Sequence, residues 1–263
     1  MAPADAEPGD LAGRVAVVTG GSSGIGRAVC LGLAARGARV VAVGTSRERL
    51  DEVASQADGI TGVQAWLGDI EGCSRAIRRA RDLGPVTILV HAAALGGYLN
   101  RPVWEETFQA WRATLALNLD AAFELTRLAA TDMMTARWGR VVMIGSTAGD
   151  VGAPAMSAYS ASKAGLLGLV RSAAHDLGPF GVTVNAVVPG WVRGTAMAER
   201  DAESEAARLG KSVETVWEER EASYPAGRVL SPSDVAGVVS FLLSESASGI
   251  SGAAIAVTLG GQW

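Results

Sequence analysis

The stretch VAVVTGGSSGIG, residues 15–26, joins a short run of branched apolar residues to a glycine-rich turn that opens a helix. A continuous apolar run of this kind is typical of a strand buried on both faces. Gly20 permits a sharp exit from the strand, Gly24 lets a ligand approach the backbone closely, and Gly26 lets the helix pack near the sheet. Because the free N–H groups at a helix start attract anions, the stretch predicts a strand–turn–helix unit that binds a pyrophosphate. A structural turn without ligand is the alternative.

Short apolar runs and longer amphipathic segments alternate along the rest of the chain. Ile25, Ala28, Val29 and Leu33 form one helical stripe, and residues 166–173 contain another. Repetition of strand and helix yields right-handed βαβ units, so we expect an α/β fold with a doubly wound, mostly parallel sheet of seven strands. The expected strands are residues 15–18, 40–43, 86–90, 141–144, 182–188 and 254–258, with a weaker strand at 63–67.

No composition break or linker divides this alternation, so we expect one domain over residues 13–263, preceded by a flexible arm, residues 1–12. Of the 263 residues, 49% are hydrophobic and 19% are charged, which is enough to bury a sizeable core. Residues 190–225 depart from the pattern because they are charged and helix-prone, with short helices expected at 199–208 and 213–222. Since this segment follows the sixth strand, we interpret it as a lid over a site, with a solvated surface decoration as the alternative.

The composition excludes several classes of function. Lys and Arg number 23 against 27 Asp and Glu, and the net charge of −4 argues against a general nucleic-acid binder. With 2 cysteines and 2 histidines, a disulfide framework, a Cys/His zinc site and a hydrolase triad are poor interpretations, and we expect no metal. The apolar runs are shorter than the roughly 18 residues of a membrane helix, and the first residues lack the basic and apolar parts of a signal peptide. We therefore expect a soluble cytoplasmic protein without nucleic-acid or membrane partners.

The sequence YSASK, residues 159–163, places Tyr159 and Lys163 four positions apart, on one face of a helix. With 3 Tyr and 2 Lys in 263 residues, chance supplies about 0.02 such pairs, and nearly all other cations of the chain are Arg. An ammonium near a phenol favours the phenolate, so we expect Lys163 to lower the pKa of Tyr159 and to make it a general acid and base. An exposed helical pair without chemistry is the alternative.

Glycines in the spacing Gly-x-x-x-Gly-x-Gly, followed by this Tyr–Lys pair, resemble the short-chain dehydrogenase/reductase family, and the resemblance extends from Arg14 to about Gly261. It implies a Rossmann-like fold with a nicotinamide dinucleotide along the carboxyl ends of the strands. It also implies an oxidoreductase that transfers hydride between the nicotinamide and a ketone or secondary alcohol, with 3-oxoacyl-carrier-protein reductases as the commonest close relatives. The implied catalytic residues are Asn118, Ser146, Tyr159 and Lys163.

The resemblance implies a role for each of these four residues. Tyr159 transfers the proton, Ser146 holds the substrate oxygen, and Lys163 binds the nicotinamide ribose and tunes Tyr159. Asn118 kinks its helix and holds a water that is linked to Lys163. Asp69-Ile70 match the family's adenine-pocket pair. The implied cofactor-binding residues are Gly20, Ser22, Ser23, Gly24, Ile25, Gly26, Thr45, Ser46, Arg47, Asp69, Ile70, Ala92, Ala93, Ala94, Tyr159, Lys163, Pro189, Gly190, Val192 and Thr195.

The end of the second strand, residues 43–47, bears on the choice between NADP and NAD. A carboxylate there would bind both ribose hydroxyls and repel a 2′-phosphate, and this stretch has none. Thr45 and Ser46 offer hydroxyls and Arg47 offers a cation, so we expect NADP(H), with NAD(H) as the alternative. A Ser46 that caps the next helix and a solvated Arg47 would explain the same residues without a phosphate.

Two segments depart from the family pattern. His91-Ala92-Ala93-Ala94 stand where Asn-Asn-Ala-Gly is usual after the fourth strand, which removes side-chain amides from the middle of the sheet. We expect His91 to be a hydrogen-bonded core residue rather than a catalyst, and the small alanines to preserve backbone contacts with the cofactor. Thr258-Leu259 replace an Asp-Gly near the last strand, a position that we interpret as structural.

The candidate substrate-binding residues are mostly apolar, which predicts a pocket for a mid-sized ketone or alcohol. A 3-oxoacyl-carrier-protein reductase would use basic residues to dock its acidic carrier; Arg137 matches one of them, but His175 stands where a second Arg is usual. A non-catalytic dinucleotide-binding regulator and a nucleotide-sugar epimerase are alternatives, disfavoured by the complete catalytic set and by the glycine spacing. The candidates are Gly96, Gly97, Tyr98, Ser146, Ala148, Val151, Trp191, Met197 and Trp217.

The family is usually homotetrameric, so the resemblance implies a homotetramer, with a homodimer as the alternative. Its shared faces would be the long helices that we expect at residues 104–137 and 157–177. The C-terminal Trp263 carries a large apolar indole, which suggests a place for it against other protein surface.

Overall fold

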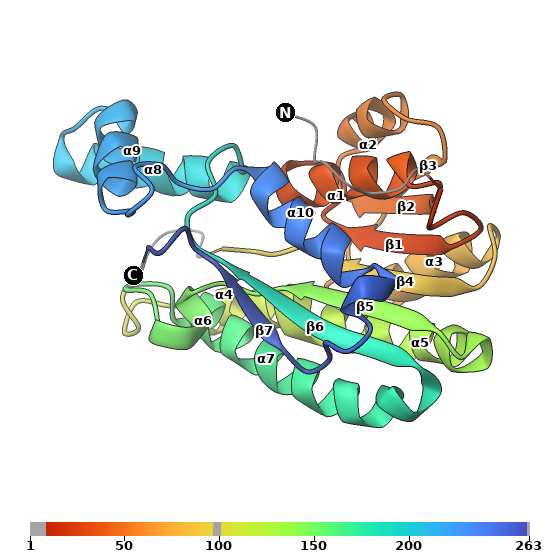
Figure 1. The fold of residues 1–263 in the computed structure, drawn as a ribbon. Coiled ribbons are helices and arrows are strands. Elements are labelled where there is room, and N and C mark those ends of the chain that lie inside the picture. The colour runs from red at the N-terminus through yellow and green to blue at the C-terminus, as the bar shows by residue number, and fades with distance from the viewer. Residues whose placement is uncertain (1–8, 97–100, 262–263) are drawn as a thin grey trace.

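Seven parallel strands form the central sheet of the computed structural model, which describes residues 9–96 and 101–261 (Figure 1). Their order across the sheet is β3-β2-β1-β4-β5-β6-β7. The chain therefore builds outward from β1 in one direction and then from β4 in the other, which confirms the doubly wound arrangement. The strands are β1 (Val15–Thr19), β2 (Arg39–Gly44), β3 (Ile60–Gln64), β4 (Val86–His91), β5 (Gly139–Ile144), β6 (Val182–Pro189) and β7 (Ala254–Val257).

Helices connect the strands and cover both faces of the sheet (Figure 1). The long helix predicted over residues 104–137 begins later, at Phe108, and a π-helical turn interrupts it, whereas the helix predicted over residues 157–177 has these bounds. The longer helices are α1 (Gly24–Ala35), α2 (Arg47–Ala54), α3 (Ile70–Arg81), α4 (Phe108–Leu115), α5 (Ala121–Ala136), α7 (Ser157–Leu177), α8 (Ala196–Leu209), α9 (Val213–Ala222) and α10 (Pro232–Leu242). The short elements are the π-helical turn η1 (Ala116–Asp120), α6 (Ala148–Val151), η2 (Gly178–Phe180) and η3 (Glu245–Ala247).

Strand side chains alternate between two apolar layers, one on each face of the sheet. Val15 and Val17 of β1 belong to the layer built with α3, α5 and α7, while Ala16 and Val18 belong to the layer built with α1, α2 and α10. Successive residues of a strand face opposite sides, so a strand covered on both faces must be apolar throughout. This requirement explains the uninterrupted Val-rich runs of the sequence.

The third strand differs from its predicted position, residues 63–67. In the structure β3 pairs with β2 from Val40 opposite Ile60 to Gly44 opposite Gln64. After Gln64 the chain leaves the sheet, so residues 65–67 form a loop at its carboxyl edge. Ala65 and Leu67 are buried there as a strand would be, which explains why their apolar character suggested one.

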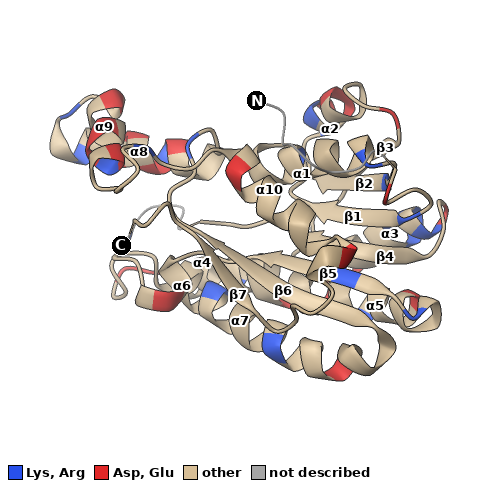
Figure 2. Cartoon of the chain, viewed as in Figure 1, with Lys and Arg blue, Asp and Glu red and all other residues tan. Residues whose placement is uncertain are grey.

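Residues 190–225 carry two helices, α8 and α9, which project from one end of the molecule (Figure 1). They match the helices predicted at 199–208 and 213–222, although α8 begins three residues earlier, behind the capping side chain of Thr195. Charged residues, most of them acidic, are frequent on both helices, whereas the strands carry few charges (Figure 2). The two helices have an apolar cluster of their own, separate from the two layers on the sheet.

The chain before β1 is packed where the structure describes it. The Leu11 side chain is buried, its N–H donates to the Arg36 carbonyl at 3.1 Å, and an Asp10 oxygen lies 2.5 Å from Arg36 Nη2. A flexible arm stays a prediction for residues 1–8, which lie outside the described residues. Within the described part of the chain, no helix combines the length and apolarity needed to cross a membrane.

Candidate active site

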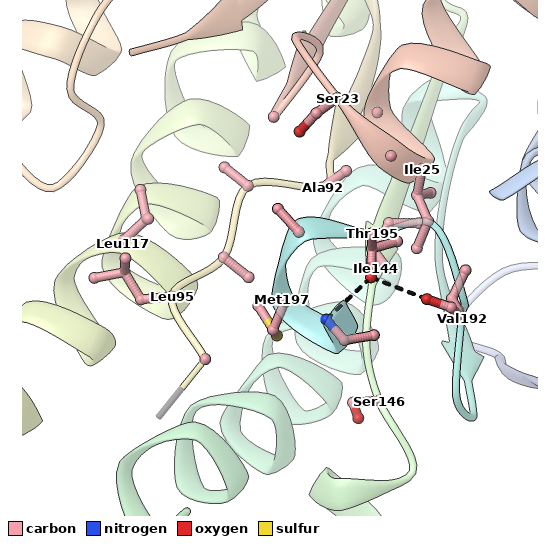
Figure 3. Close-up of a pocket in the computed structure, with 18 of the residues that line it drawn as sticks. Ser23, Ile25, Ala92, Leu95, Leu117, Ile144, Ser146, Val192, Thr195 and Met197 are labelled. Carbon is pink, nitrogen blue, oxygen red and sulfur yellow. Dashed lines mark hydrogen bonds between the residues drawn. The ribbon is translucent and has the colours of Figure 1, made fainter. Parts of the chain in front are cut away.

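The carboxyl ends of the strands open into a cavity of about 570 Å³ (Figure 3). Its lining comes from the β1–α1 turn, the ends of β2 and β3, the loop after β4, the end of β5, α7 and the β6–α8 segment. Sheets of this kind bind ligands where the strand order reverses, here between β1 and β4. The predicted site residues that line the cavity are Gly20, Ser22, Ser23, Gly24, Ile25, Gly26, Thr45, Ala92, Ala93, Ala94, Gly96, Ser146, Ala148, Tyr159, Lys163, Pro189, Gly190, Trp191, Val192, Thr195 and Met197.

Some predicted site residues lie away from this cavity or cannot be placed. Gly97 and Tyr98, like Trp263, lie outside the described residues. Seven further predicted site residues do not line the cavity: Ser46, Arg47, Asp69, Ile70, Asn118, Val151 and Trp217.

The glycine turn has the shape that its sequence predicts. Gly20 and Gly24 have φ angles of +65° and +51°, a region that side chains disfavour. A Cβ on Gly26 would lie 2.2 Å from the Gly20 carbonyl oxygen, so only glycine lets the first turn of α1 close onto the loop. A Cβ on Gly20 would lie 2.9 Å from the Ala93 nitrogen. The turn therefore packs closely against α1 and the loop after β4, and its residues line the cavity.

Thr19 ties the glycine turn to the loop after β4. Its Oγ1 accepts hydrogen bonds from the N–H groups of Ala92 and Ala93, both at 3.0 Å, and lies 3.1 Å from His91 Nδ1. Because that oxygen already accepts twice, its own hydrogen points to Nδ1, which assigns the His91 proton to Nε2. Burial, followed by the nearby Lys163 charge, lowers the pKa of His91 to about 3. His91 is thus a neutral, hydrogen-bonded core residue, as expected.

Asn118 lies in the π-helical turn η1, so the predicted backbone irregularity is present. Its side chain is fully buried and holds the loop after β4: Nδ2 donates to the Leu95 carbonyl at 2.9 Å, and Oδ1 accepts from the Leu95 N–H at 2.8 Å. Nδ2 also donates to Ser162 Oγ of α7 at 3.0 Å. Asn118 therefore braces the cavity wall from behind rather than lining it.

Ser146, Tyr159 and Lys163 meet at the inner end of the cavity. Tyr159 and Lys163 lie one turn apart on α7, and Lys163 Nζ lies 5.6 Å from the centre of the Tyr159 ring. Lys163 Nζ donates to the Ile144 carbonyl at the end of β5 at 2.6 Å. Ser146 follows that strand end, so β5 and α7 together set the distance between the hydroxyl and the phenol. Gly149 allows this packing, because a Cβ there would lie 2.8 Å from the Lys163 carbonyl carbon.

The expected lowering of the Tyr159 pKa is not found in this structure. Burial raises the pKa of Tyr159, and its hydrogen bond with the Ser146 side chain offsets part of that rise. Lys163 donates to the Ile144 carbonyl, and its charge is not among the causes that shift the Tyr159 pKa. Burial lowers the pKa of Lys163 itself to about 8, which makes this amine easy to deprotonate near neutral pH.

Ser46 and Arg47 do not line the cavity, and their contacts match the alternative of a helix cap and a solvated cation, so their binding to the cofactor stays a prediction. Ser46 Oγ caps α2 by accepting the Arg49 N–H at 3.3 Å, and the exposed Arg47 pairs with Asp51 at 3.1 Å. The cation that lines the cavity is Arg49, which sequence analysis missed. Its guanidinium makes no ion pair within residues 9–96 and 101–261. The helix-capping residue Ser46 could have indicated this arginine in the sequence. With Ser46 as the cap, α2 starts at Arg47, and its third residue, Arg49, faces the end of the strand.

Asp69 and Ile70 do not line this cavity either, so their role at the adenine stays a prediction. Asp69 caps α3 by accepting the Gly72 N–H at 2.7 Å, and Ile70 is 71% exposed. Because β3 ends at Gln64, the residues that reach the cavity from it are Ala65, Trp66 and Leu67. The Trp66 indole lies over Gly68, where a Cβ would lie 2.6 Å from Nε1.

Two predicted substrate residues belong elsewhere. Val151 ends α6 with its side chain 65% exposed, outside the cavity lining. Trp217 is 1% exposed in the apolar cluster of α8 and α9, where its Nε1 donates to Glu199 at 3.1 Å. The predicted Trp191 and Met197 do line the cavity. Residues that sequence analysis missed at this end are Leu95, Leu117, Met156, Arg200, Asp201 and Ser204.

Thr195 shows how the β6–α8 segment closes over the glycine turn. Its Oγ1 donates to the Val192 carbonyl at 3.0 Å and accepts the Ala198 N–H at 3.3 Å (Figure 3). A Cβ on Gly24 would lie 3.2 Å from Thr195 Cγ2, so the two segments are already close.

The family model for short chain dehydrogenases matches residues 14–206. The chain belongs to the short-chain dehydrogenase/reductase family. Its relatives include the 3-oxoacyl-(acyl-carrier-protein) reductase FabG of Aquifex aeolicus, 36% identical over 95% of this chain and 98% of the relative. The D-beta-hydroxybutyrate dehydrogenase of Cupriavidus necator is 33% identical over 92% of this chain and 95% of the relative.

Solved structures agree with this family. A structure from Beutenbergia cavernae, assigned to an NAD(P)-dependent gluconate 5-dehydrogenase with bound NADP, has a TM-score of 0.83 and 38% identity, over 95% of this chain and 97% of that one. A variant of the actinorhodin polyketide ketoreductase with NADPH has a TM-score of 0.89 and 29% identity, over 97% and 99%. This short-chain dehydrogenase is therefore an NAD(P)-dependent oxidoreductase of ketones and secondary alcohols, and neither a regulator nor an epimerase is favoured.

Proposed function

We propose that this short-chain dehydrogenase is an NADPH-dependent ketoreductase that reduces a mid-sized ketone, with Tyr159 as the proton donor. The observation that carries the proposal is the convergence of Ser146, Tyr159 and Lys163 on one cavity, together with a glycine turn at the start of a helix. A hydroxyl and a phenol placed together can hold a carbonyl oxygen and deliver a proton to it.

The glycine turn fits the phosphates of a dinucleotide. Gly20 and Gly24 adopt the positive φ angles that shape the turn, and the serines between them, Ser22 and Ser23, line the cavity. The first N–H groups of α1 have no intrahelical partner and favour negative charge. When bound, the nicotinamide supplies or accepts the hydride.

The chain's own residues divide the remaining work. Ser146 orients the substrate oxygen, and Tyr159, kept protonated by burial, donates its proton as the alcohol forms. Lys163, with its pKa near 8, is protonated at neutral pH yet gives up its proton easily, so it can recharge Tyr159. Asn118 is a positioning residue that links Leu95, which lines the cavity, to Ser162 of α7.

The adenosine end supports a preference for NADP(H) over NAD(H). No carboxylate lies among the cavity residues from β2 and α2, whereas the Arg49 guanidinium lies there without an ion pair in the described chain. A free guanidinium binds a 2′-phosphate well, and a missing carboxylate removes the repulsion that would select against it. Trp66 offers an aromatic face to the adenine at the same end.

The opposite end supports an apolar substrate. Its apolar lining suits the carbon skeleton of a mid-sized ketone, and the polar Arg200, Asp201 and Ser204 lie beside it. The apolar lining residues are Leu95, Leu117, Met156, Trp191 and Met197. A 3-oxoacyl thioester is the second candidate, because several curated relatives are named 3-oxoacyl-carrier-protein reductases.

NADPH consumption tests the proposal. The purified protein is mixed with NADPH or NADH and with ketones of increasing size, a 3-oxoacyl thioester among them, and the loss of nicotinamide absorbance is recorded. We expect turnover with NADPH, slower turnover with NADH, and dependence on Tyr159. Absence of turnover with both cofactors across the whole series would reject the function, and higher activity with NADH would reject the cofactor preference.

We further propose a homotetramer that works in the cytoplasm. Trp104, Phe108 and Phe123 present large apolar side chains at the surface near and along α4 and α5, as an interface would. Cys30 and Cys73 are free and buried, in keeping with a reducing compartment. Light scattering after size-exclusion chromatography tests the assembly, and a monomer would contradict it.

A further inference from the structure

Arg220 of α9 lies behind the substrate end of the cavity. Its side chain is only 8% exposed, and its Nη2 donates to Asp201 at 2.6 Å and to Glu205 at 2.7 Å, both on α8. Burying a guanidinium is costly unless carboxylates neutralise it and hydrogen bonds hold it. Arg220 therefore fixes α9 to α8 through charge as well as through the apolar cluster between them.

The same guanidinium stacks on aromatic rings. Arg220 Cζ lies 3.7 Å from the centre of the Trp191 ring and 4.9 Å from that of Trp217. The two indoles meet edge to face, with centres 6.5 Å apart and planes at 88°. A planar cation at this distance restrains both the position and the tilt of the Trp191 ring.

Two partners of Arg220 line the cavity, although Arg220 itself does not. Trp191 belongs to the segment that follows β6, and Asp201 to the inward face of α8, one turn after Met197. One buried side chain thus holds two wall residues that come from separate elements. A substrate that reaches this wall therefore contacts residues whose positions depend on Arg220 of α9.

We propose that Arg220 is a positioning residue for substrate selection: by stacking on Trp191 and pairing with Asp201, it fixes the wall that large ketones contact. The proposal rests on the ketone-reducing function proposed above. It assigns to α9, which contributes no cavity residue in the described chain, control over substrate size. The ligand class concerned is an apolar ketone long enough to reach Trp191.

Steady-state kinetics with a small and a large ketone test this role. In Arg220→Met, we expect the KM for decalone to rise about tenfold or more with kcat nearly unchanged, because ground-state and transition-state binding are lost together. The KM for butanone and the dissociation constant of NADPH should stay within about twofold, since neither depends on this wall. Arg220→Lys should be intermediate, because it keeps the charge but loses the planar stack.

Arg193 provides a matched control. It also pairs with two carboxylates, Glu214 and Glu221, and lies over Trp217 at 5.3 Å, but it is 38% exposed and does not line the cavity. Arg193→Met should leave the KM for decalone unchanged. An equal rise in both variants, or an equal rise for butanone and decalone, would show general loosening of α8 and α9 and overturn the proposal. An unchanged KM in Arg220→Met would overturn it as well.

A spectroscopic readout separates this proposal from the proposed function. The edge-to-face indole pair should give an exciton signal in the circular dichroism spectrum, which Trp191→Phe removes and Arg193→Met preserves. We expect Arg220→Met to reduce this signal while the helical signal remains. If the wild-type protein reduces no ketone, the proposed function fails, yet the signal still decides whether Arg220 orders Trp191. An unaltered signal in Arg220→Met contradicts the proposal.

Discussion

At the scale of single residues, the spacing of Tyr159 and Lys163 predicts their shared helix face correctly but predicts the wrong pKa direction for the phenol. The spacing of two residues predicts that their side chains are neighbours, but it does not predict which hydrogen-bond acceptor the lysine amine contacts. Here Lys163 donates to the Ile144 carbonyl, and burial then raises the Tyr159 pKa. A phenol that keeps its proton is suited to donate it, which favours the direction of ketone reduction.

Removing the phenolic hydroxyl should therefore stop proton transfer and leave binding intact. Tyr159→Phe is expected to lower kcat about 100- to 10,000-fold, the usual contribution of a general acid. The dissociation constant of NADPH, measured by fluorescence, should change less than about twofold, because the ring still fills its buried place. Turnover close to that of the wild type would contradict the assignment of Tyr159.

The two arginines at the start of α2 offer a direct test of the adenosine end. Arg49→Gln should weaken NADPH binding about ten- to a hundredfold, the value of a charge-assisted hydrogen bond, with little effect on NADH. Arg47→Gln should change neither, because Arg47 is exposed and paired with Asp51. Titrations of both variants with both cofactors provide the measurement. The reverse pattern would restore the sequence-based assignment of Arg47.

At the scale of elements, the strand–helix alternation could be predicted because its cause is simple. Strands covered on both faces are apolar throughout, and helices covered on one face are striped, so order and type follow from the pattern. The glycine turn could be predicted too, since Gly20, Gly24 and Gly26 each meet a steric need that is visible in the structure.

What sequence could not supply were the ends of elements. The strand β3 stops at Gln64 rather than at residue 67, and Trp66, not Asp69, lines the cavity after it. Ser46 caps α2, and Arg49 rather than Arg47 is the arginine of this helix that lines the cavity. Where a strand stops depends on its neighbour's register, and apolar residues that line a cavity resemble apolar residues of a strand.

Alanine substitutions at two glycines of α1, Gly26 and Gly32, distinguish the steric requirement of the turn from the general cost of glycine in a helix. Gly26→Ala places a methyl group against the Gly20 carbonyl, so we expect a loss of about 1–3 kcal/mol in the free energy of unfolding and weaker NADPH binding. Gly32 has open space around its Cβ position, and Gly32→Ala should instead gain about 0.5–1 kcal/mol from the helix. Urea unfolding monitored by circular dichroism measures both. Equal effects in the two variants would refute this distinction.

At the scale of the whole molecule, the middle of the sheet carries a titratable group. His91 ends β4, the strand beside the reversal of strand order, and is fully buried. Its ring is hydrogen-bonded to Thr19 of β1, whose hydroxyl also holds the loop that forms one cavity wall. Protonation of this ring therefore opposes the fold at its centre, where no relaxation of a surface loop can relieve it.

The free energy of unfolding should consequently begin to fall near pH 6.5, above the range in which ordinary carboxylates titrate. The pKa of His91 is about 3 in the fold against an ordinary 6.5, so the unfolded chain takes up the proton first as pH falls below 6.5. Between pH 7.5 and 4.5 this linkage removes about 2–3 kcal/mol, at 1.36 kcal/mol per unit. Asp10, Glu124 and Asp234, whose pKa values the fold lowers from an ordinary 3.8, 4.5 and 3.8, add to this loss only toward the acid end of the range. Urea unfolding at both pH values and one protein concentration should show this loss in the wild type and in His175→Asn, whose histidine is exposed. His91→Asn should remove most of it, and a variant that loses as much as the wild type would place the acid sensitivity elsewhere.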